Sequence, residues 1–216
     1  MRRFVFFAAC LTVGSIAVGI CGCSSKSDAT SDNFAKVIDS DLLAKNVYLC
    51  SPDLAFPVKD GQNLRALWPD TFAALEALEH AGKVKSEMVP AADSGDALDK
   101  SGRVRSWTPV DERDPLFVHH MEPNLGASGK HLVGQYCYGK KRVEKVVKWE
   151  GPGEMGGSTI AIVYYTYRLD NLQSWALDPA LKGESRQVRS QVDGQGKTLL
   201  TVPLVLTSEG WEVQGG

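Results

Sequence analysis

The stretch Ser158–Leu169, "STIAIVYYTYRL", decides the fold. It is rich in β-branched and aromatic residues on both of its faces, a composition that favours a β-strand. Side chains alternate along a strand, so residues two apart share a side. We therefore predict a strand here, with these residues on one side: Ala161, Val163, Tyr165, Tyr167 and Leu169.

Other segments around this stretch are also predicted to be strands. "HLVGQYCY" (131–138) is one, and "RVEKVVKW" (142–149) alternates. "KTLLTVPLVLTS" (197–208) and "WEVQ" (211–214) form a hairpin through "SEG". The alternation in 142–149 places four residues on one face: Val143, Lys145, Val147 and Trp149. The whole set makes an antiparallel sheet of four or five strands.

Helices are expected in the first half of the chain. One follows "SDNFAKVIDSDLLAK" (31–45), with Ser31 or Asp32 as its cap and a stripe of Phe34, Val37, Ile38 and Leu42. A second follows "WPDTFAALEALEHAGKV" (68–84), which Asp70 caps and Gly82 ends. Its apolar stripe is Phe72, Leu75 and Leu78. The order of helix, glycine and strand is similar to part of a winged-helix unit, but it has no basic face and does not imply DNA binding. Helices followed by strands predict an α+β protein in which the helices cover one face of the sheet.

The strand order, the "NLQSWALDPAL" excursion and the terminal "VLTSEGWEV" are similar to cystatin-like and nuclear-transport-factor-like domains. Those domains have curved sheets. More broadly, "YCYGKKRVEKVVKWEGPG", "VYYTYRLDNLQSWA" and "LVLTSEGWEV" resemble a group of uncharacterised proteobacterial lipoproteins, from about Leu132 to Val213. The group has no established activity to carry over. The resemblance implies N-terminal helices packed on or beside a curved antiparallel sheet of four to five strands.

The N-terminus has the layout of an export signal. Arg2 and Arg3 precede an uncharged run from Phe4 to Gly22. The end of this run, "ICGC", resembles the bacterial lipobox, which implies cleavage before Cys23, a diacylglyceryl group on its thiol and a further fatty acyl chain such as palmitate. Several chains anchor a protein stably in a bilayer. An uncleaved membrane helix is the alternative, since a span needs about 20 apolar residues.

The segment after the lipobox cysteine, "SSKSDATSDN", has no large apolar side chain and is predicted to be a flexible tether. In enterobacterial lipoproteins an aspartate after the lipidated cysteine implies inner-membrane retention, so Ser24 favours the outer membrane by resemblance. We expect a protein of the bacterial cell envelope that faces the periplasm. The predicted regions are a signal peptide (1–22), a tether (23–33), a mainly helical region (34–105), a linker or loop (106–130) and a β domain (131–216).

The charge of the chain argues against nucleic acid as a partner, and the arrangement of its histidines argues against a metal ion. The chain has 24 Lys and Arg against 26 Asp and Glu, with no basic block, so nucleic acid is not an expected partner. His119, His120, Met121 and His131 could attract copper or zinc. Adjacent strand residues such as His119 and His120 point to opposite faces, however, so surface histidines are the favoured interpretation. No metal or cofactor is predicted.

Cys50 and Cys137 are the two thiols left once Cys10 and Cys21 leave with the signal peptide and Cys23 is lipidated. In an oxidising compartment such a pair predicts one disulfide. The bridge would stabilise the fold by an upper limit on the order of 4–5 kcal/mol. Two buried free thiols are the alternative.

Sequence motifs supply no reaction chemistry. "GPGEMG" (151–156) matches a dinucleotide fingerprint, but a strand follows it where a helix is required, which favours a hairpin loop. A nucleophile elbow is absent from the sequence, and catalytic residues are therefore not predicted, although an enzyme stays the third hypothesis.

The favoured hypothesis is a non-catalytic envelope lipoprotein that contacts a protein partner or supports envelope integrity. Its possible interface is aromatic: Tyr136, Tyr138, Tyr164, Tyr165, Tyr167 and Trp175. Core packing would explain the inward half of these residues equally well. The second hypothesis is a carrier for a small apolar ligand, in a cavity between sheet and helices lined by Ile160, Ile162 and Tyr164.

Overall fold

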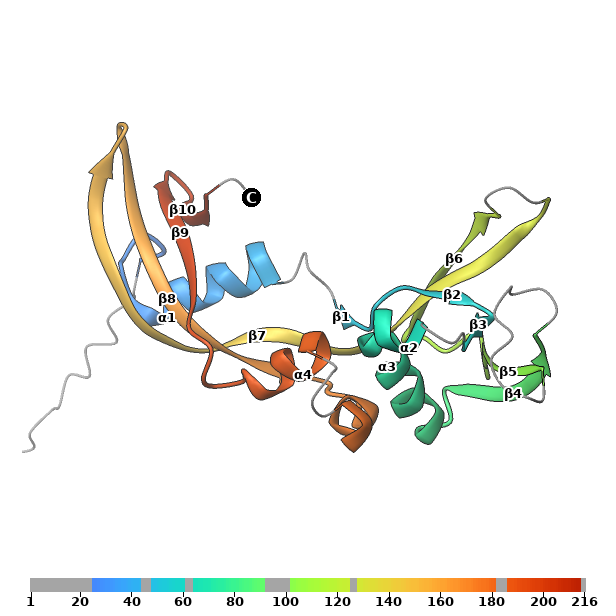
Figure 1. Ribbon diagram of the computed structural model, residues 1–216. Helices are drawn as coiled ribbons and strands as arrows, with labels where there is room; N and C mark the ends of the chain where they lie inside the picture. Colours follow the sequence, from blue (N-terminus) through green and yellow to red (C-terminus); the bar gives the residue numbers. More distant parts are fainter. Residues whose placement is uncertain are drawn as a thin grey trace, which may run out of the picture.

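The computed structural model describes residues 25–43, 48–60, 64–91, 102–124, 128–181 and 186–214. The fold is α+β, with helices beside a strongly curled antiparallel sheet, as predicted (Figure 1). The strands are β1 (Leu49–Cys50), β2 (Leu54–Phe56), β3 (Val58–Lys59), β4 (Val84–Pro90), β5 (Arg103–Pro109), β6 (Phe117–Pro123), β7 (Lys130–Met155), β8 (Ser158–Asp170), β9 (Leu200–Thr207) and β10 (Gly210–Val213). The helices are α1 (Ser31–Val37), the π-helical η1 (Ile38–Leu43), α2 (Leu64–Leu67), α3 (Pro69–His80), the 3₁₀ turns η2 (Ser174–Leu177) and η3 (Pro179–Leu181), and α4 (Arg186–Asp193).

One long ladder organises the fold. β7 and β8 pair antiparallel from Lys140 opposite Asp170 to Met155 opposite Ser158. The segments 131–138 and 142–149, predicted as separate strands, are both parts of β7. Near Gly139 the strand changes partners without turning, because β6, β1 and β2 pair with its first part and β8 with its second.

Seven strands form the main sheet, in the order β1-β7-β8-β9-β10 with β2 and β6 also paired to β7, and a second sheet has the order β3-β5-β4. β6 and much of β5 lie in the region 106–130, which composition predicted to be a linker or loop. Each carries a large buried aromatic side chain, Trp107 in β5 and Phe117 in β6. The burial of these rings outweighs the polar composition around them.

Bulges in β7 change which residues face the core. The register shifts between Val143 and Lys145 and again between Val146 and Lys148. Val143 and Val146 are buried, whereas Val147 is 48% exposed. Of the predicted face, Val143 and Trp149 do belong to the core around α1 but Lys145 and Val147 are exposed, because the first bulge inverts the alternation and the second restores it. On β8, where no bulge intervenes, the predicted side from Ala161 to Leu169 is buried.

α1 lies in the hollow of the curled sheet (Figure 1). Its Phe34 ring packs edge-to-face against Trp149 and Trp211, with ring centroids 5.4 and 5.2 Å apart. Thr30 caps the helix, since its hydroxyl accepts from the Asn33 N–H at 3.3 Å, and it does so in place of the predicted Ser31 or Asp32. The first helix thus belongs to the same core as the last strands.

α3 and the 3₁₀ turns form a second core with the first part of β7. Phe72, Leu75 and Leu78 are buried, as the periodicity implied. Pro69 opens the helix and no side chain caps it, so Asp70 is an acidic residue of the first turn and not the cap. At the other end the Lys83 N–H donates to the Leu78 carbonyl at 2.8 Å and Gly82 has φ +68°, the Schellman arrangement expected at a helix stop.

The predicted regions differ from the spatial arrangement. β1 and β2, from the region predicted to be helical, pair with β7, and α1 packs beside β10. The predicted tether also overlaps folded chain, because residues from Ser25 onward are held against the turn between β9 and β10. Residues 1–22 and Cys23 lie outside the described residues.

Candidate functional site

Cys50 and Cys137 are the sequence-predicted pair that the structure brings together. They stand directly opposite each other on β1 and β7, and their sulfur atoms are at disulfide distance. The pair joins the two-residue β1 to the first part of β7, next to the point at which β7 changes partners. The pair therefore links β1 to β7.

The six predicted interface aromatics are mostly core residues. Five of them are no more than 3% exposed: Tyr136, Tyr138, Tyr165, Tyr167 and Trp175. Buried hydroxyls find partners, as when Tyr136 donates to the Lys83 carbonyl at 3.0 Å. Burial raises the pKa of Tyr136 and Tyr138, which keeps both neutral. Only Tyr164 of the six is partly exposed, under the Lys148 ammonium at 4.3 Å, so these residues do not form a shared interface.

The three histidines considered as metal ligands, His119, His120 and His131, lie on the β6–β7 hairpin. His119 stands opposite Gly134 and stacks on the Phe117 ring, whereas His120 alternates to the other face, where its Nε2 lies 2.8 Å from Glu122. His131 stands opposite Glu122. Within the described residues, no group of three or more His, Cys, Asp or Glu side chains is arranged to hold a metal ion.

An apolar groove is the feature that sequence reasoning missed. It has a volume of about 360 Å³ and lies between the β2–β3 segment and the α2–α3 helices. One wall carries Leu54, Ala55, Pro57 and Val58, and the other carries Leu64, Trp68, Thr71 and Phe72. Asp53 and Lys59 are its charged members. The sequence signal was two short apolar runs, "LAFPV" and "LRALW", which come together only in the fold.

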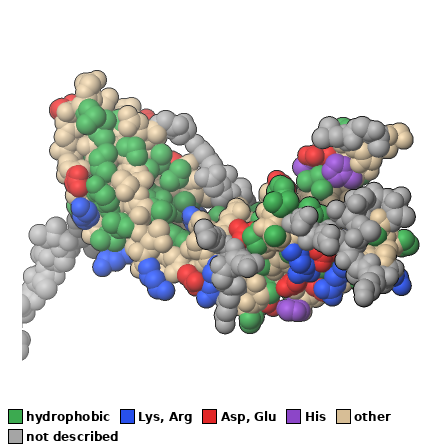
Figure 2. All heavy atoms as spheres, viewed as in Figure 1, with side chains coloured by type: hydrophobic (Ala, Val, Ile, Leu, Met, Phe, Trp, Pro, Cys, Tyr) green, Lys and Arg blue, Asp and Glu red, His purple; other side chains and the backbone are tan. Residues whose placement is uncertain are grey.

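The rim of the groove is unusually apolar for an exposed surface. Trp68 is 61% exposed and its neighbour Leu67 is 68% exposed, at the junction where α2 ends and Pro69 starts α3. The space-filling view shows hydrophobic side chains on the surface of this half of the molecule among charged ones (Figure 2). An exposed tryptophan beside an apolar groove is typical of a binding surface.

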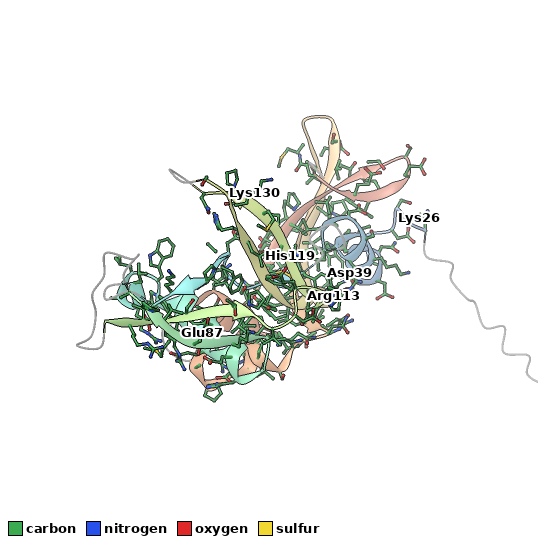
Figure 3. All side chains as sticks on the ribbon, turned by 90° about the vertical axis from the view of Figure 1, so that its right-hand side faces the viewer. Lys26, Asp39, Glu87, Arg113, His119 and Lys130 are labelled. Carbon is green, nitrogen blue, oxygen red and sulfur yellow. A yellow bond between two sulfur atoms is a disulfide. The ribbon has the colours of Figure 1, made fainter. Side chains whose placement is uncertain are left out.

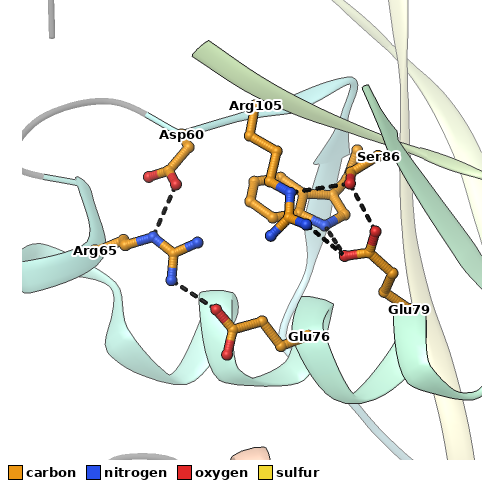
Figure 4. A network of polar contacts seen from close by, with 7 residues as sticks. Asp60, Arg65, Glu76, Glu79, Ser86 and Arg105 are labelled. Carbon is orange, nitrogen blue, oxygen red and sulfur yellow. Dashed lines mark hydrogen bonds and ion pairs between the residues drawn. The ribbon is translucent and has the colours of Figure 1, made fainter. Parts of the chain in front are cut away.

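A polar network around Arg65 and Glu79 (Figure 4) adjoins the groove, because Arg65 lies over the ring of Phe72, which lines it. The Arg65 guanidinium lies 5.1 Å from the centre of the Phe72 ring and donates to Asp60 at 2.8 Å and Glu76 at 2.7 Å. Desolvation would lower the pKa of Arg65, but these two carboxylates raise it, so the cation is held in place. Arg65 therefore ties α2 to Asp60, directly after β3, and to Glu76 in the second half of α3.

Glu79 forms the second half of this network. It accepts from the Ser86 hydroxyl at 2.6 Å and from the Trp107 indole N–H at 3.0 Å, and Arg105 lies 3.7 Å away. Burial would raise the pKa of Glu79, but the two hydrogen bonds and the Arg105 charge lower it. The ionised carboxylate therefore ties α3 to β4 and β5.

A second groove, of about 550 Å³, lies between α1 and the β9–β10 hairpin. Its lining mixes charges of both signs: Lys26, Asn33, Lys36, Val37, Ser40, Asp41, Glu209, Trp211 and Glu212. Neither groove is lined by Ile160, Ile162 or Tyr164, the residues predicted for an apolar cavity.

In the part of the chain that the structure describes, no helix combines the length and apolarity required to cross a bilayer. Comparison with known protein families, with curated proteins and with solved structures finds no match for this chain.

Proposed function

We propose that the protein is a lipid-anchored protein of the bacterial cell envelope whose apolar groove binds an apolar segment of a partner protein. The observation that carries the binding half is the exposed Trp68 beside a groove walled by Leu54, Pro57 and Phe72. Aromatic side chains of this kind supply much of the free energy at protein interfaces. The anchoring half rests on the lipobox-like "ICGC" and Cys23.

A protein segment fits the groove better than a small molecule does. A small ligand lying between the walls would leave Leu67 and the outer part of Trp68 in water, whereas a protein surface would cover both. The polar side chains that line the groove are Asp53, Lys59 and Thr71. We therefore propose that the groove binds a segment of a partner protein.

Site-specific photo-crosslinking tests the binding half. A photoreactive amino acid at Leu67 is expected to give a defined adduct in intact cells, and Trp68→Ala is expected to abolish it. The same amino acid at Val110, which is also exposed but outside the groove, is the matched control. Equal adducts from both positions, or an adduct that survives Trp68→Ala, would contradict a role for the groove.

A carrier for a small apolar ligand is the second candidate function, because the floor of the groove is apolar and partly buried. It predicts that a fluorescent fatty acid binds the purified protein and that Trp68→Ala weakens this binding at least tenfold. Binding of that probe without any crosslinked protein in cells would favour the carrier.

Intact mass spectrometry of protein extracted from its own membranes tests the anchoring half. We expect cleavage before Cys23, added acyl mass, and two thiols that react only after reduction. A full-length mass with all five thiols reactive before reduction would contradict the lipid anchor and the disulfide together.

A further inference from the structure

The chain that follows Cys23 is clamped to the body of the protein. The Trp211 indole N–H donates to the Ser27 carbonyl at 3.0 Å, and the Asn33 side-chain amide donates to the Ser25 carbonyl at 2.6 Å. Lys26 lies so close to Gly210 that a Cβ there would stand 3.0 Å from the Lys26 Cβ and 3.1 Å from its carbonyl oxygen. We call residues Ser25–Thr30, with the β9–β10 turn that they contact, the N-terminal clamp.

The clamp places the lipid attachment point close to one end of the molecule. Only Ser24 separates Cys23 from Ser25 in the sequence, and two residues of extended chain span at most about 7 Å. A lipid on Cys23 would therefore emerge beside the β9–β10 turn and α1. A flexible tether would let the folded part move away from its anchor. The contacts of Ser25, Lys26 and Ser27 instead hold this segment against the folded part.

We propose that the clamp holds the α1 and β9–β10 end of the protein directly against the bilayer surface, so that the opposite end points away from the membrane. This inference rests on the proposed lipidation of Cys23. Lys26 and Glu87 lie at opposite ends of the molecule, as Figure 3 and the positions of α1 and β4 in Figure 1 show. Trp68 and its groove belong to the same half as β4, and this orientation leaves them free to meet a partner.

The chemistry of the anchored end fits a lipid headgroup layer. Its groove carries two ammonium groups, Lys26 and Lys36, and three carboxylates, those of Asp41, Glu209 and Glu212. This mixture matches zwitterionic headgroups and gives no strong preference for anionic lipid. Trp211 is only 4% exposed and already serves the clamp, so it does not insert into the bilayer. The acyl chains supply the attachment, and the clamp supplies the orientation.

Energy transfer to the membrane surface tests the orientation. The full-length lipoprotein is purified from its own membranes and reconstituted into phosphatidylcholine vesicles that carry an acceptor dye on their headgroups. A donor dye is attached either to Glu209→Cys, in the β9–β10 turn, or to Glu87→Cys, on β4. We expect transfer from position 209 to exceed transfer from position 87 several-fold, and to be unchanged when anionic lipid is added.

A variant with ten Gly and Ser residues inserted after Ser24 is the control, because its folded part is no longer held close to the lipid. It is expected to leave vesicle flotation intact and to remove most of the difference between the two positions. Equal transfer from both positions in the unmodified lipoprotein, with flotation intact, overturns the orientation but not the anchor. Failure of the unmodified protein to float overturns both.

Two glycine variants test the clamp itself. Gly210→Ala, at φ +116°, places a methyl group against Lys26, whereas Gly157→Ala, also at a positive φ (+81°), places it in open space. We expect Gly210→Ala to increase hydrogen exchange at residues 25–30 and to reduce the contrast between positions 209 and 87. Gly157→Ala should do neither. Equal effects of the two variants would overturn the clamp as the cause of the orientation.

Discussion

Glu79 illustrates how one carboxylate can make stability depend on pH. The pKa of Glu79 is lowered from its ordinary value of 4.5 in the folded protein, so the unfolded chain binds more protons in acid. Its contribution to the free energy of unfolding is complete above pH 4.5 and is lost as the pH falls through the lower, folded pKa. Asp114, held by Lys83 at 2.6 Å and by the Leu116 N–H, follows the same direction.

We predict that Glu79→Gln lowers the free energy of unfolding at pH 7 by about 1.5–3 kcal/mol, the usual scale for hydrogen bonds to a charged group. The difference from wild type should shrink between pH 5 and pH 3, because protonation removes the same charge from wild type. Urea unfolding at several pH values measures this. Glu87→Gln, an exposed residue of β4, is the control, and an equal loss at every pH would contradict the role of charge.

Gly134 tests close packing at a single position. A Cβ on this β7 residue would collide with the Phe117 ring of β6, which stacks on Tyr136 and His119. Overpacking of this kind costs about 1–3 kcal/mol, so Gly134→Ala is expected to lower the midpoint of thermal unfolding by several degrees. Gly153→Ala, on the same strand with nothing within 4 Å, should have a much smaller effect.

At the scale of elements, the bulges of β7 decide which valine is in the core. Val146 is 7% exposed and Val147 is 48% exposed, although simple alternation places Val147 inward. We predict that Val146→Asn lowers the free energy of unfolding by about 2–4 kcal/mol, because it loses apolar burial and leaves an amide without partners. Val147→Asn should change it by less than about 0.5 kcal/mol. The reverse order in urea unfolding would contradict the register.

The Cys50–Cys137 pair belongs to the same scale, because it joins β1 to β7. We predict that the double variant Cys50→Ser/Cys137→Ser lowers the free energy of unfolding by about 2–4 kcal/mol, chiefly by freeing the unfolded chain. Wild type in reductant should unfold at the same midpoint as the variant. A midpoint for wild type that reductant leaves unchanged would show that the thiols are free.

At the scale of the whole molecule, two hydrophobic cores share one ladder. Leu75 and Trp107 belong to the core around α3, and Leu204 and Trp211 belong to the core around α1. β8 contributes Tyr167 to the first core and Tyr165 to the second, so neither core can come apart without disturbing the other.

We therefore predict a single unfolding transition. Leu75→Ala and Leu204→Ala should each lower the free energy of unfolding by about 2–5 kcal/mol. In fluorotryptophan-labelled protein, the folded signals of Trp107 and Trp211 should vanish at the same urea concentration in both variants. Loss of one signal well before the other would show that the two cores unfold independently.

The local pattern of the sequence by itself predicted several elements correctly. The buried side of β8, the stripe of α3 and its stop at Gly82, and the α+β class all follow from the spacing of apolar residues and from glycine chemistry. These features depend on residues within a few positions of each other, so a linear sequence contains all the information needed. The lipid anchor is likewise an expectation of the sequence, because its residues are contiguous.

Only the tertiary structure decided the rest. Five predicted interface aromatics became core residues, the predicted tether became the clamp, and two apolar runs joined into a groove. Each outcome depends on partners far away in the chain, such as Ser27 and Trp211, or on a bulge that local alternation does not announce. The physical reason is that burial is a property of the packed assembly: a side chain is inside or outside according to what folds against it.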